Sequence, residues 1–233
     1  MSILETTAYR YEVEWWQQHI AEDGGDAHEH LVEAANPNRP IADYIAQYMK
    51  DASDSIIDVG AGPMTQVGHV LDGRPVHVTA IDPLANSYDK LAFRRPRPVA
   101  TRFGFGENLS ELFARNTFDI AHARNSLDHS IDPLKCIYEM INVTKPGGYI
   151  ILRHCMAEGA RTSYVGLHQW DLLANDGCFY VANRDRDVIV NVTKQLDYLA
   201  EQVAVETPAI YSPMLKSDVM WVQAVFKKRA PLE

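Results

Sequence analysis

The chain has few of the residues that build disulfide-stabilised or zinc-binding proteins. Its 233 residues include three cysteines, Cys136, Cys155 and Cys178, which are scattered and have no C-x-x-C spacing. An odd, dispersed set provides neither the paired framework of a small secreted domain nor the closely spaced ligands of a structural zinc site. A protein without disulfides suits a reducing compartment, so we expect a cytoplasmic location.

Long apolar runs and an excess of basic residues are also lacking. No stretch approaches the roughly 18 apolar residues that a membrane-spanning helix needs. The first residues, MSILETTAYRYEVEWW, do not have the basic and then apolar order of a secretory signal. The formal net charge is −9, which disfavours a polyanionic partner. We therefore expect a protein that acts on neither nucleic acid nor a membrane, while the oligomeric state stays open.

The sequence does have an alternation of short apolar runs and longer segments. Five runs after residue 54 have the length and bounding turns of buried strands: SIIDVG, VHVTAID, VATRF, FDIAHA and YIILRHC. Between them, TQVGHVLDG (65–73) and DPLKCIYEMINVTKPGG (132–148) read as helices that end near glycine. Strands that alternate with helices imply a parallel sheet covered on both faces. The expected fold class is α/β, a doubly wound and mostly parallel sheet of seven strands.

The two ends of the chain follow other patterns. Residues 1–50 suggest two helices, YRYEVEWWQQHI and RPIADYIAQYMK, joined by the polar link AEDGGDAHEH. Later segments suggest two strands around a polar turn in CFYVANRDRDVIVNV, a helix near KQLDYLAEQV and a final strand, MWVQAVFKK. We expect one domain of three parts: an N-terminal helical extension (1–50), a ligand-binding core (55–154), and an insertion with the final strands (155–233).

Glycines and acids gather where the expected strands end. The first strand runs into the turn Gly60-Ala61-Gly62, where the lack of a Cβ lets the backbone approach a ligand closely. In an open α/β sheet, ligands bind at the carboxyl ends of the strands. Asp82, at the end of the second strand, is a suitable acceptor for both hydroxyls of a ribose. The G-x-G-x-x-G fingerprint of dinucleotide sites is not met, because the next glycine is Gly68.

Taken in order, these segments resemble the class I S-adenosylmethionine-dependent methyltransferases. IIDVGAG is similar to the family's first glycine turn, AIDP to its ribose-binding acid and GEN to its adenine-binding acid. FDIAHARNSLDH resembles the strand that lines the sulfonium, and KPGGYIIL the turn before the fifth strand. The resemblance runs from about Ser55 to Arg153. One position departs from it, because Met64 stands where the family often has a further glycine.

The resemblance implies a Rossmann-like methyltransferase fold with S-adenosyl-L-methionine as cofactor. It implies that the cofactor-binding residues are Asp58, Gly60, Ala61, Gly62, Asp82, Pro83, Glu107, Asn108, Arg124 and Asn125. We expect the helical extension to act as a lid, because it is rich in aromatic residues and precedes the sheet. The nucleoside has a cationic sulfonium and no phosphate. It therefore needs close backbone approach and hydroxyl acceptors rather than a phosphate cradle.

Methyl transfer to a hydroxyl requires a group that removes the hydroxyl proton, and histidine has a suitable pKa. His154 directly follows the fifth strand, and His168 lies in the insertion beyond it. Asp128 and His129 follow the fourth strand. We expect His154, His168 and Asp128 to be catalytic, with His129 behind them. We assign no metal ligands, because no spacing in the sequence demands a metal, and whether a divalent metal held by some of these residues assists stays open.

The absence of one motif narrows the range of acceptor classes. Many nucleic-acid and amide N-methyltransferases have Asn-Pro-Pro-Tyr after the fourth strand, where this chain has Asn-Ser-Leu-Asp at 125–128. The YEVEWW start and the GLHQW segment are similar to methyltransferases of surface-glycan and secondary-metabolite pathways. This resemblance implies O-methylation of a small molecule, such as a sugar or a secondary metabolite. Two alternatives stay open: a catalytically silent, cofactor-binding subunit and a nucleotide-dependent oxidoreductase.

Overall fold

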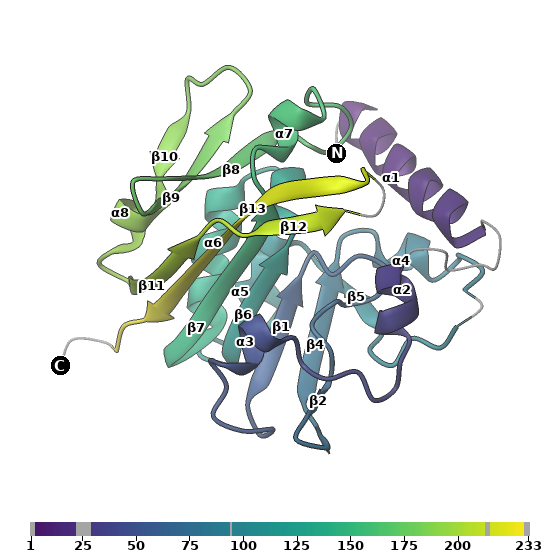
Figure 1. Cartoon of the computed structure of the whole chain (residues 1–233), viewed down its shortest axis with the longest axis horizontal. Coiled ribbons are helices and arrows are strands. Elements are labelled where there is room, and N and C mark those ends of the chain that lie inside the picture. Colours follow the sequence, from purple (N-terminus) through teal and green to yellow (C-terminus); the bar gives the residue numbers. More distant parts are fainter. Residues whose placement is uncertain (1–2, 22–28, 94, 213–214, 231–233) are drawn as a thin grey trace.

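A central sheet organises the molecule. The structure, a computed structural model, describes residues 3–21, 29–93, 95–212 and 215–230 (Figure 1). The sheet contains β1 (Ser55–Val59), β4 (His77–Asp82), β5 (Thr101–Phe103), β6 (Phe118–Arg124), β7 (Thr144–Cys155), β11 (Ala200–Glu206) and β13 (Ser217–Lys228). Their order is β5-β4-β1-β6-β7-β13-β11, and β12 (Ala209–Ser212) pairs with β13 beside this path. The first five of these strands are parallel, and β13 is antiparallel to both of its neighbours. The predicted fold class is confirmed.

The strand β1 shows why the core strands are apolar throughout. Ile56 and Ile57 are both fully buried, although successive residues point to opposite faces of a sheet. Ile56 packs in a cluster with residues of α3 (Asp43–Ala46), whereas Ile57 packs in the cluster of α6 (Pro133–Val143). The helix α6 begins as predicted, because the Asp132 side chain accepts from the Lys135 amide at 2.9 Å and proline follows directly. Layers on both faces therefore protect β1 from water.

Of the two predicted N-terminal helices, the first is confirmed by α1 (Ile3–Ala21) and the second is shorter than predicted. Residues 22–28 of the predicted link lie outside the described residues, and a helix that was not predicted, α2 (Glu29–Ala34), begins at Glu29 of this link. The helix predicted over 39–50 is wrong beyond α3, which is followed by turns. Figure 1 shows α1 at the end of the sheet toward which β1 and β4 point. Among the described residues, no helix is long and apolar enough to cross a membrane.

One further predicted helix is wrong and another is shorter than predicted. The segment 65–73 forms turns and, with β2 (Val70–Leu71) and β3 (Arg74–Pro75), a small hairpin. The backbone at Gly68 has φ +85° and lies so close to Pro40 that a Cβ would be 2.0 Å from its carbonyl oxygen. The segment near KQLDYLAEQV forms only α8 (Val192–Leu196) before β11, because pairing with β13 competes with a longer helix.

The segment after β7 forms a small subsheet at the same end of the molecule as α1. The segment begins with α7 (Glu158–Arg161). The subsheet contains β8 (Trp170–Asn175), β9 (Cys178–Asn183) and β10 (Ile189–Asn191), in the order β10-β9-β8 (Figure 1). The antiparallel pair β9 and β10 confirms the predicted strands around a polar turn. The remaining helical turns are α4 (Ala85–Tyr88), η1 (Gly106–Asn108), α5 (Leu109–Leu112) and η2 (Leu127–His129).

Candidate functional site

The glycine turn after β1 has a backbone that only glycine fits. Gly60 and Gly62 have φ values of +71° and +65°, in the left-handed region. A Cβ on Gly60 would lie 2.4 Å from the Cβ of Ser126, which no real contact allows. The amides of Gly60 and Ala61 both donate to the carbonyl of Ile81, at 2.9 and 3.0 Å. The turn is therefore fixed between β4 and the segment that follows β6.

Asp82 ends β4 and lies against this turn. Its Oδ2 accepts from the Gly62 amide at 3.0 Å and its Oδ1 accepts from the Leu84 amide at 2.8 Å. The residue is 7% exposed. Burial raises the pKa of Asp82 to about 6, and the two amide hydrogen bonds only partly oppose this rise. Each carboxylate oxygen keeps acceptor capacity for a further hydroxyl. The turn and Asp82 thus fit the nucleoside that the sequence predicts.

Asp58 lies in a different environment, inside the fold. Its Oδ1 is 2.7 Å from Nδ1 of His122, and its Oδ2 accepts from the Thr65 hydroxyl at 2.5 Å. Nε2 of His122 is in turn 3.0 Å from the hydroxyl of Tyr44. Sequence reasoning missed His122 and Tyr44. The available signal was a histidine in the otherwise apolar strand FDIAHA, which pairs in register with Asp58.

The predicted adenine-side residues lie at the start of α6. Oε1 of Glu107 accepts from the amides of Ile131 and Asp132, at 2.9 and 3.3 Å. Oδ1 of Asn108 accepts from the Lys135 ammonium at 3.3 Å. In this structure both side chains hold the entry to α6, and their role toward a cofactor stays a prediction.

The roles of Pro83, Arg124 and Asn125 toward a cofactor stay predictions. The Arg124 guanidinium lies over the ring of Trp221, 5.3 Å from its centroid. Oδ1 of Asn125 accepts from the Cys155 amide at 3.0 Å and so joins the ends of β6 and β7. Pro83 continues the chain from Asp82 and is partly exposed. The structure therefore brings together the glycine turn and Asp82, while Arg124 and Asn125 lie toward β7 and β13.

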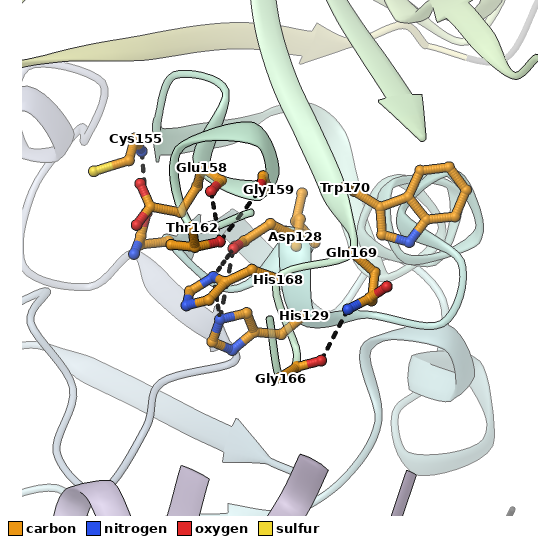
Figure 2. Close-up of polar contacts among 12 residues, drawn as sticks. Asp128, His129, Cys155, Glu158, Gly159, Thr162, Gly166, His168, Gln169 and Trp170 are labelled. Carbon is orange, nitrogen blue, oxygen red and sulfur yellow. Dashed lines mark hydrogen bonds and ion pairs between the residues drawn. The ribbon is translucent and has the colours of Figure 1, made fainter. Parts of the chain in front are cut away.

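Asp128, His129 and His168 form a cluster, called here the His–Asp cluster. Nδ1 of His168 is 2.6 Å from Oδ2 of Asp128 and 2.9 Å from Nε2 of His129. The same Nε2 is 3.5 Å from Oδ2 of Asp128. Figure 2 shows the three side chains pointing toward one another. The Asp128 side chain is fully buried, whereas the His129 and His168 side chains are 21% and 25% exposed.

The charges within the cluster stabilise one another. Burial lowers the pKa of His168, but the hydrogen bond and the charge of Asp128 outweigh burial and raise it above its usual value. Burial raises the pKa of Asp128, but the charges of His129 and His168 outweigh burial and lower it. A buried carboxylate beside two imidazoles thus remains ionised.

The insertion holds His168 in this position. The Gln169 amide donates to the carbonyl of Asp128 at 2.9 Å, and the Trp170 indole donates to the carbonyl of Ser130 at 3.0 Å. The Gln169 side chain donates to the carbonyl of Gly166 at 2.9 Å (Figure 2). These bonds fix the start of β8 against η2. His168 therefore meets Asp128 although 40 positions separate them in the sequence.

His154 lies behind the cluster rather than within it. Its side chain is fully buried, and both ring nitrogens lack a hydrogen-bond partner among the described residues. Burial lowers the pKa of His154 to about 3, so the imidazole is neutral. The sequence grouped His154 with His168 as the leading candidates. Of these two residues, His168 is partly exposed and can contact a ligand, whereas His154 is fully buried. A catalytic role for His154 stays a prediction.

The helix α1 covers the glycine turn. A Cβ on Gly62 would lie 3.7 Å from the Trp16 ring, and the Trp16 indole donates to Glu12 at 2.9 Å. Tyr11 of the same helix lies beside Gly166, because a Cβ on Gly166 would be 3.5 Å from its ring. Ser126 packs against Gly60 and leads directly into η2, which contains Asp128 and His129. The nucleoside site and the His–Asp cluster are therefore neighbours under the same helix.

Met64, the residue that departs from the family pattern, supports this helix. It is 2% exposed and packs in one cluster with Ile20 of α1, with Leu31 of α2 and with Trp16. The Met64 side chain therefore provides apolar packing contacts for the N-terminal helices, which a glycine could not provide.

Three comparisons bear on identity. A family model described as a methyltransferase domain matches residues 31–186. An uncharacterized methyltransferase of Schizosaccharomyces pombe is 32% identical over 120 residues, which are 46% of this chain and 41% of that protein. The chain thus spans less than half the length of this curated relative.

Solved structures share the fold at low sequence identity. The PH0226 protein of Pyrococcus horikoshii gives a TM-score of 0.53 at 15% identity, over 93% of this chain and 99% of the other. The 1,6-didemethyltoxoflavin-N1-methyltransferase of Burkholderia thailandensis, solved with its substrate and S-adenosylhomocysteine, gives 0.51 at 14% identity, over 99% of this chain and 92% of the other. These likenesses concern the fold alone.

Proposed function

Because this chain belongs to the methyltransferase-domain family, whose model matches residues 31–186, we propose that it transfers a methyl group from S-adenosyl-L-methionine to a hydroxyl of a small molecule. The acceptor is a sugar or a secondary metabolite. The observation that carries the choice of a hydroxyl is the His–Asp cluster beside the nucleoside site. Family membership disfavours the oxidoreductase alternative.

The residues of the glycine turn fit the methyl donor. When bound, S-adenosyl-L-methionine supplies an electrophilic methyl group on a sulfonium. Gly62 leaves backbone surface beside Trp16 that a Cβ would fill, whereas Gly60 lets the turn pack against Ser126. Asp82 offers its carboxylate oxygens to the ribose hydroxyls. Glu107 and Asn108 are proposed for the adenine side. Asp58 supports the turn from inside through Thr65 and His122.

The His–Asp cluster supplies what a hydroxyl acceptor needs. A hydroxyl is a weak nucleophile until its proton is removed or its pKa is lowered. His168 and His129 are the exposed members of the cluster, and Asp128 orients them from the buried side. We assign proton removal to this cluster, with His168 and Asp128 as its main members.

The cover over the site favours a small acceptor. The helix α1 lies on one side and the insertion on the other, and a Cβ on Gly166 would be 3.5 Å from the Tyr11 ring. By its name, the Burkholderia thailandensis neighbour methylates a small molecule at nitrogen. A small acceptor is thus consistent with the substrate in that protein's name. The choice of oxygen as the methylated atom depends on the His–Asp cluster.

An acceptor screen tests the proposal. The full chain is incubated with S-adenosyl-L-methionine and panels of sugars, phenols and amines, and release of S-adenosylhomocysteine is followed. We expect turnover with a hydroxyl compound, and an O-methyl group in the product by NMR. Products methylated only at nitrogen would contradict the choice of acceptor atom, and absence of turnover with intact cofactor binding would favour the silent subunit.

Cofactor binding should weaken in acid. The pKa of Asp82 is about 6 without a bound ligand, so the carboxylate takes up a proton as the pH falls through this value. Hydroxyl donors bind the ionised form, and binding must then release the proton. Below pH 6 we expect the affinity for S-adenosylhomocysteine to fall by up to about tenfold per pH unit. Calorimetry between pH 5 and 8 measures this slope.

The control for this prediction is Asp82→Asn, which cannot ionise. We expect this variant to bind more weakly by about 1–3 kcal/mol at pH 7.5, with little change between pH 5 and 7. Equal pH slopes in parent and variant would show that another group titrates. Asp82→Ala with parental affinity would show that the ribose lies elsewhere.

The helix α1 should slow exchange of the cofactor, as a lid does. Trp16 packs beside Gly62 on the covered side of the site. We expect Trp16→Ala to release S-adenosylhomocysteine several times faster, measured by displacement with labelled S-adenosyl-L-methionine. Arg10→Ala is the matched control on the same helix, because the Arg10–Glu14 pair is exposed. Equal release rates in parent and Trp16→Ala would show that α1 is not a lid.

A further inference from the structure

Three potential metal-ligand atoms meet in the His–Asp cluster. They are Oδ2 of Asp128, Nε2 of His129 and Nδ1 of His168, and all lie within 4.8 Å of one another. Their pairwise separations are 2.6, 2.9 and 3.5 Å. Three electron-donating atoms this close together share either ring hydrogens or a cation.

Ring hydrogens alone satisfy this arrangement poorly. A neutral imidazole has one N–H, and Nδ1 of His168 lies within hydrogen-bond distance of both Asp128 and His129. A hydrogen on this Nδ1 would be divided between two acceptors. If Nε2 of His129 instead donated to Nδ1 of His168, that Nδ1 would carry no hydrogen, and its lone pair would face the Asp128 carboxylate 2.6 Å away.

The separations suit a small cation. Bonds of about 2.0–2.1 Å to imidazole nitrogen and carboxylate oxygen are usual for zinc. Ligand atoms at octahedral or tetrahedral angles around such an ion are then about 2.9–3.4 Å apart. The observed separations, 2.6 to 3.5 Å, bracket this interval. Shifts of a few tenths of an ångström would complete the coordination.

A second observation comes from the carboxylate itself. Oδ1 of Asp128 is buried and has no hydrogen-bond partner among the described residues. Leaving one oxygen of a buried carboxylate bare is unfavourable unless a charge compensates nearby. The two ring nitrogens of His154 also have no hydrogen-bond partner among the described residues, so His154 does not donate to this oxygen. A cation beside Oδ2 would compensate the whole carboxylate.

We propose that the His–Asp cluster binds one divalent transition-metal cation through Asp128, His129 and His168. Two imidazoles and one carboxylate suit manganese, iron, cobalt or zinc, and suit magnesium or calcium poorly, because these two prefer oxygen ligands. Three protein ligands leave further positions open. Because the His129 and His168 side chains are partly exposed, a molecule from solvent has access to the cluster.

The role of the cation rests on the proposed function. A hydroxyl oxygen bound at an open position loses its proton more readily, as water does on a protein-bound metal. The O–H bond breaks and the proton passes to solvent water, while the oxygen keeps the electron pair and forms the new bond to the methyl carbon. The bond between the methyl carbon and the sulfonium sulfur breaks in the same step, its electron pair stays on sulfur, and S-adenosylhomocysteine leaves. In this form His168 holds the cation, and Asp128 balances its charge.

Cobalt binding tests the site without reference to activity. The full chain is treated with a chelator, exchanged into metal-free buffer and titrated with Co²⁺ alone. We expect one equivalent per chain by calorimetry, with visible absorption bands of a nitrogen- and oxygen-ligated ion. His129→Ala and His168→Ala should each weaken binding by at least about tenfold, the scale for a lost metal contact. His77→Ala is the control, because His77 is exposed at the opposite end of β4.

Variants that fail to bind Co²⁺ must still be folded. Retained binding of S-adenosylhomocysteine provides this check, and His129→Gln serves as a second variant of similar size. Absence of saturable binding of Co²⁺, Mn²⁺ or Zn²⁺ to the parent, or binding that survives in both alanine variants, would overturn the metal site.

Activity separates this inference from the proposed function. Loss of hydroxyl methylation after chelation, and its recovery with added Mn²⁺ or Zn²⁺, would support the role of the cation. Full hydroxyl methylation by metal-free enzyme would refute that role and leave the proposed function standing. Stoichiometric Co²⁺ binding without methylation of any hydroxyl would refute the proposed function and leave the site standing.

Discussion

Replacing His168 with alanine is expected to lower turnover by on the order of 10²–10⁴, the usual share of assisted proton removal. The imidazole is 25% exposed and lies 2.6 Å from the buried Asp128 carboxylate. Without it, the acceptor hydroxyl has neither a base nor, in the metal-bound form, a complete ligand set. Steady-state assays with the acceptor found in the screen measure the loss, and Asp128→Asn should produce a similar one.

The same variant should bind S-adenosylhomocysteine nearly as the parent does, because the nucleoside contacts Asp82 and the glycine turn. His77→Ala again serves as the control and should retain full turnover. Full turnover in His168→Ala would show that the acceptor needs only positioning. Lost cofactor binding would show instead that the cluster supports the fold of the nucleoside site.

Replacing Gly60 with alanine is expected to abolish measurable cofactor binding. The new Cβ would lie 2.4 Å from that of Ser126, and the residue has a φ of +71°. The clash must displace either the turn or the segment that leads into η2. We also expect thermal unfolding at a lower temperature, with a loss of about 1–3 kcal/mol from backbone strain. Calorimetry and thermal denaturation measure the two effects.

The chain offers a matched control for this substitution. Gly73 has a nearly equal φ of +73°, but a Cβ there would meet nothing within 4 Å. Gly73→Ala therefore has the same backbone strain without the clash, and should bind the cofactor normally. The double variant Gly60→Ala/Ser126→Gly removes the facing Cβ and should recover part of the binding. Parental affinity in Gly60→Ala alone would contradict the geometry of the turn.

Those parts of the fold whose signals are local were predictable from the sequence. The strand β1 is a short apolar run that ends at glycine, and α6 has a capping acid, a proline and apolar residues at helical spacing. The helix predicted for segment 65–73 does not form. Contact of Gly68 with Pro40 and the hydrogen bond from Thr65 to Asp58 override its helix-like pattern. Such tertiary contacts leave little trace in a local pattern.

The site was predictable to a similar extent. Asp82 and the glycine turn follow their strands directly, so the order of strands placed them at one edge. The contact of His168 with Asp128 depends on how an insertion folds back, and spacing does not encode this. The prediction that His154 follows the fifth strand is wrong, because His154 lies within β7, one residue before its end, and its side chain is fully buried in the core. Position in the chain predicted which strand end a residue occupies, but not which way its side chain faces.

The origin of His168 has a consequence for how this protein can diversify. The core contributes Asp128 and His129, whereas the subsheet segment contributes the third side chain of the cluster, fixed by Gln169 and Trp170. The same segment forms one wall around the acceptor. Reactivity and recognition are thus inherited together. A substitution that reshapes this segment for a new acceptor therefore also affects the position of His168. Acceptor binding and reactivity are expected to change together in such variants.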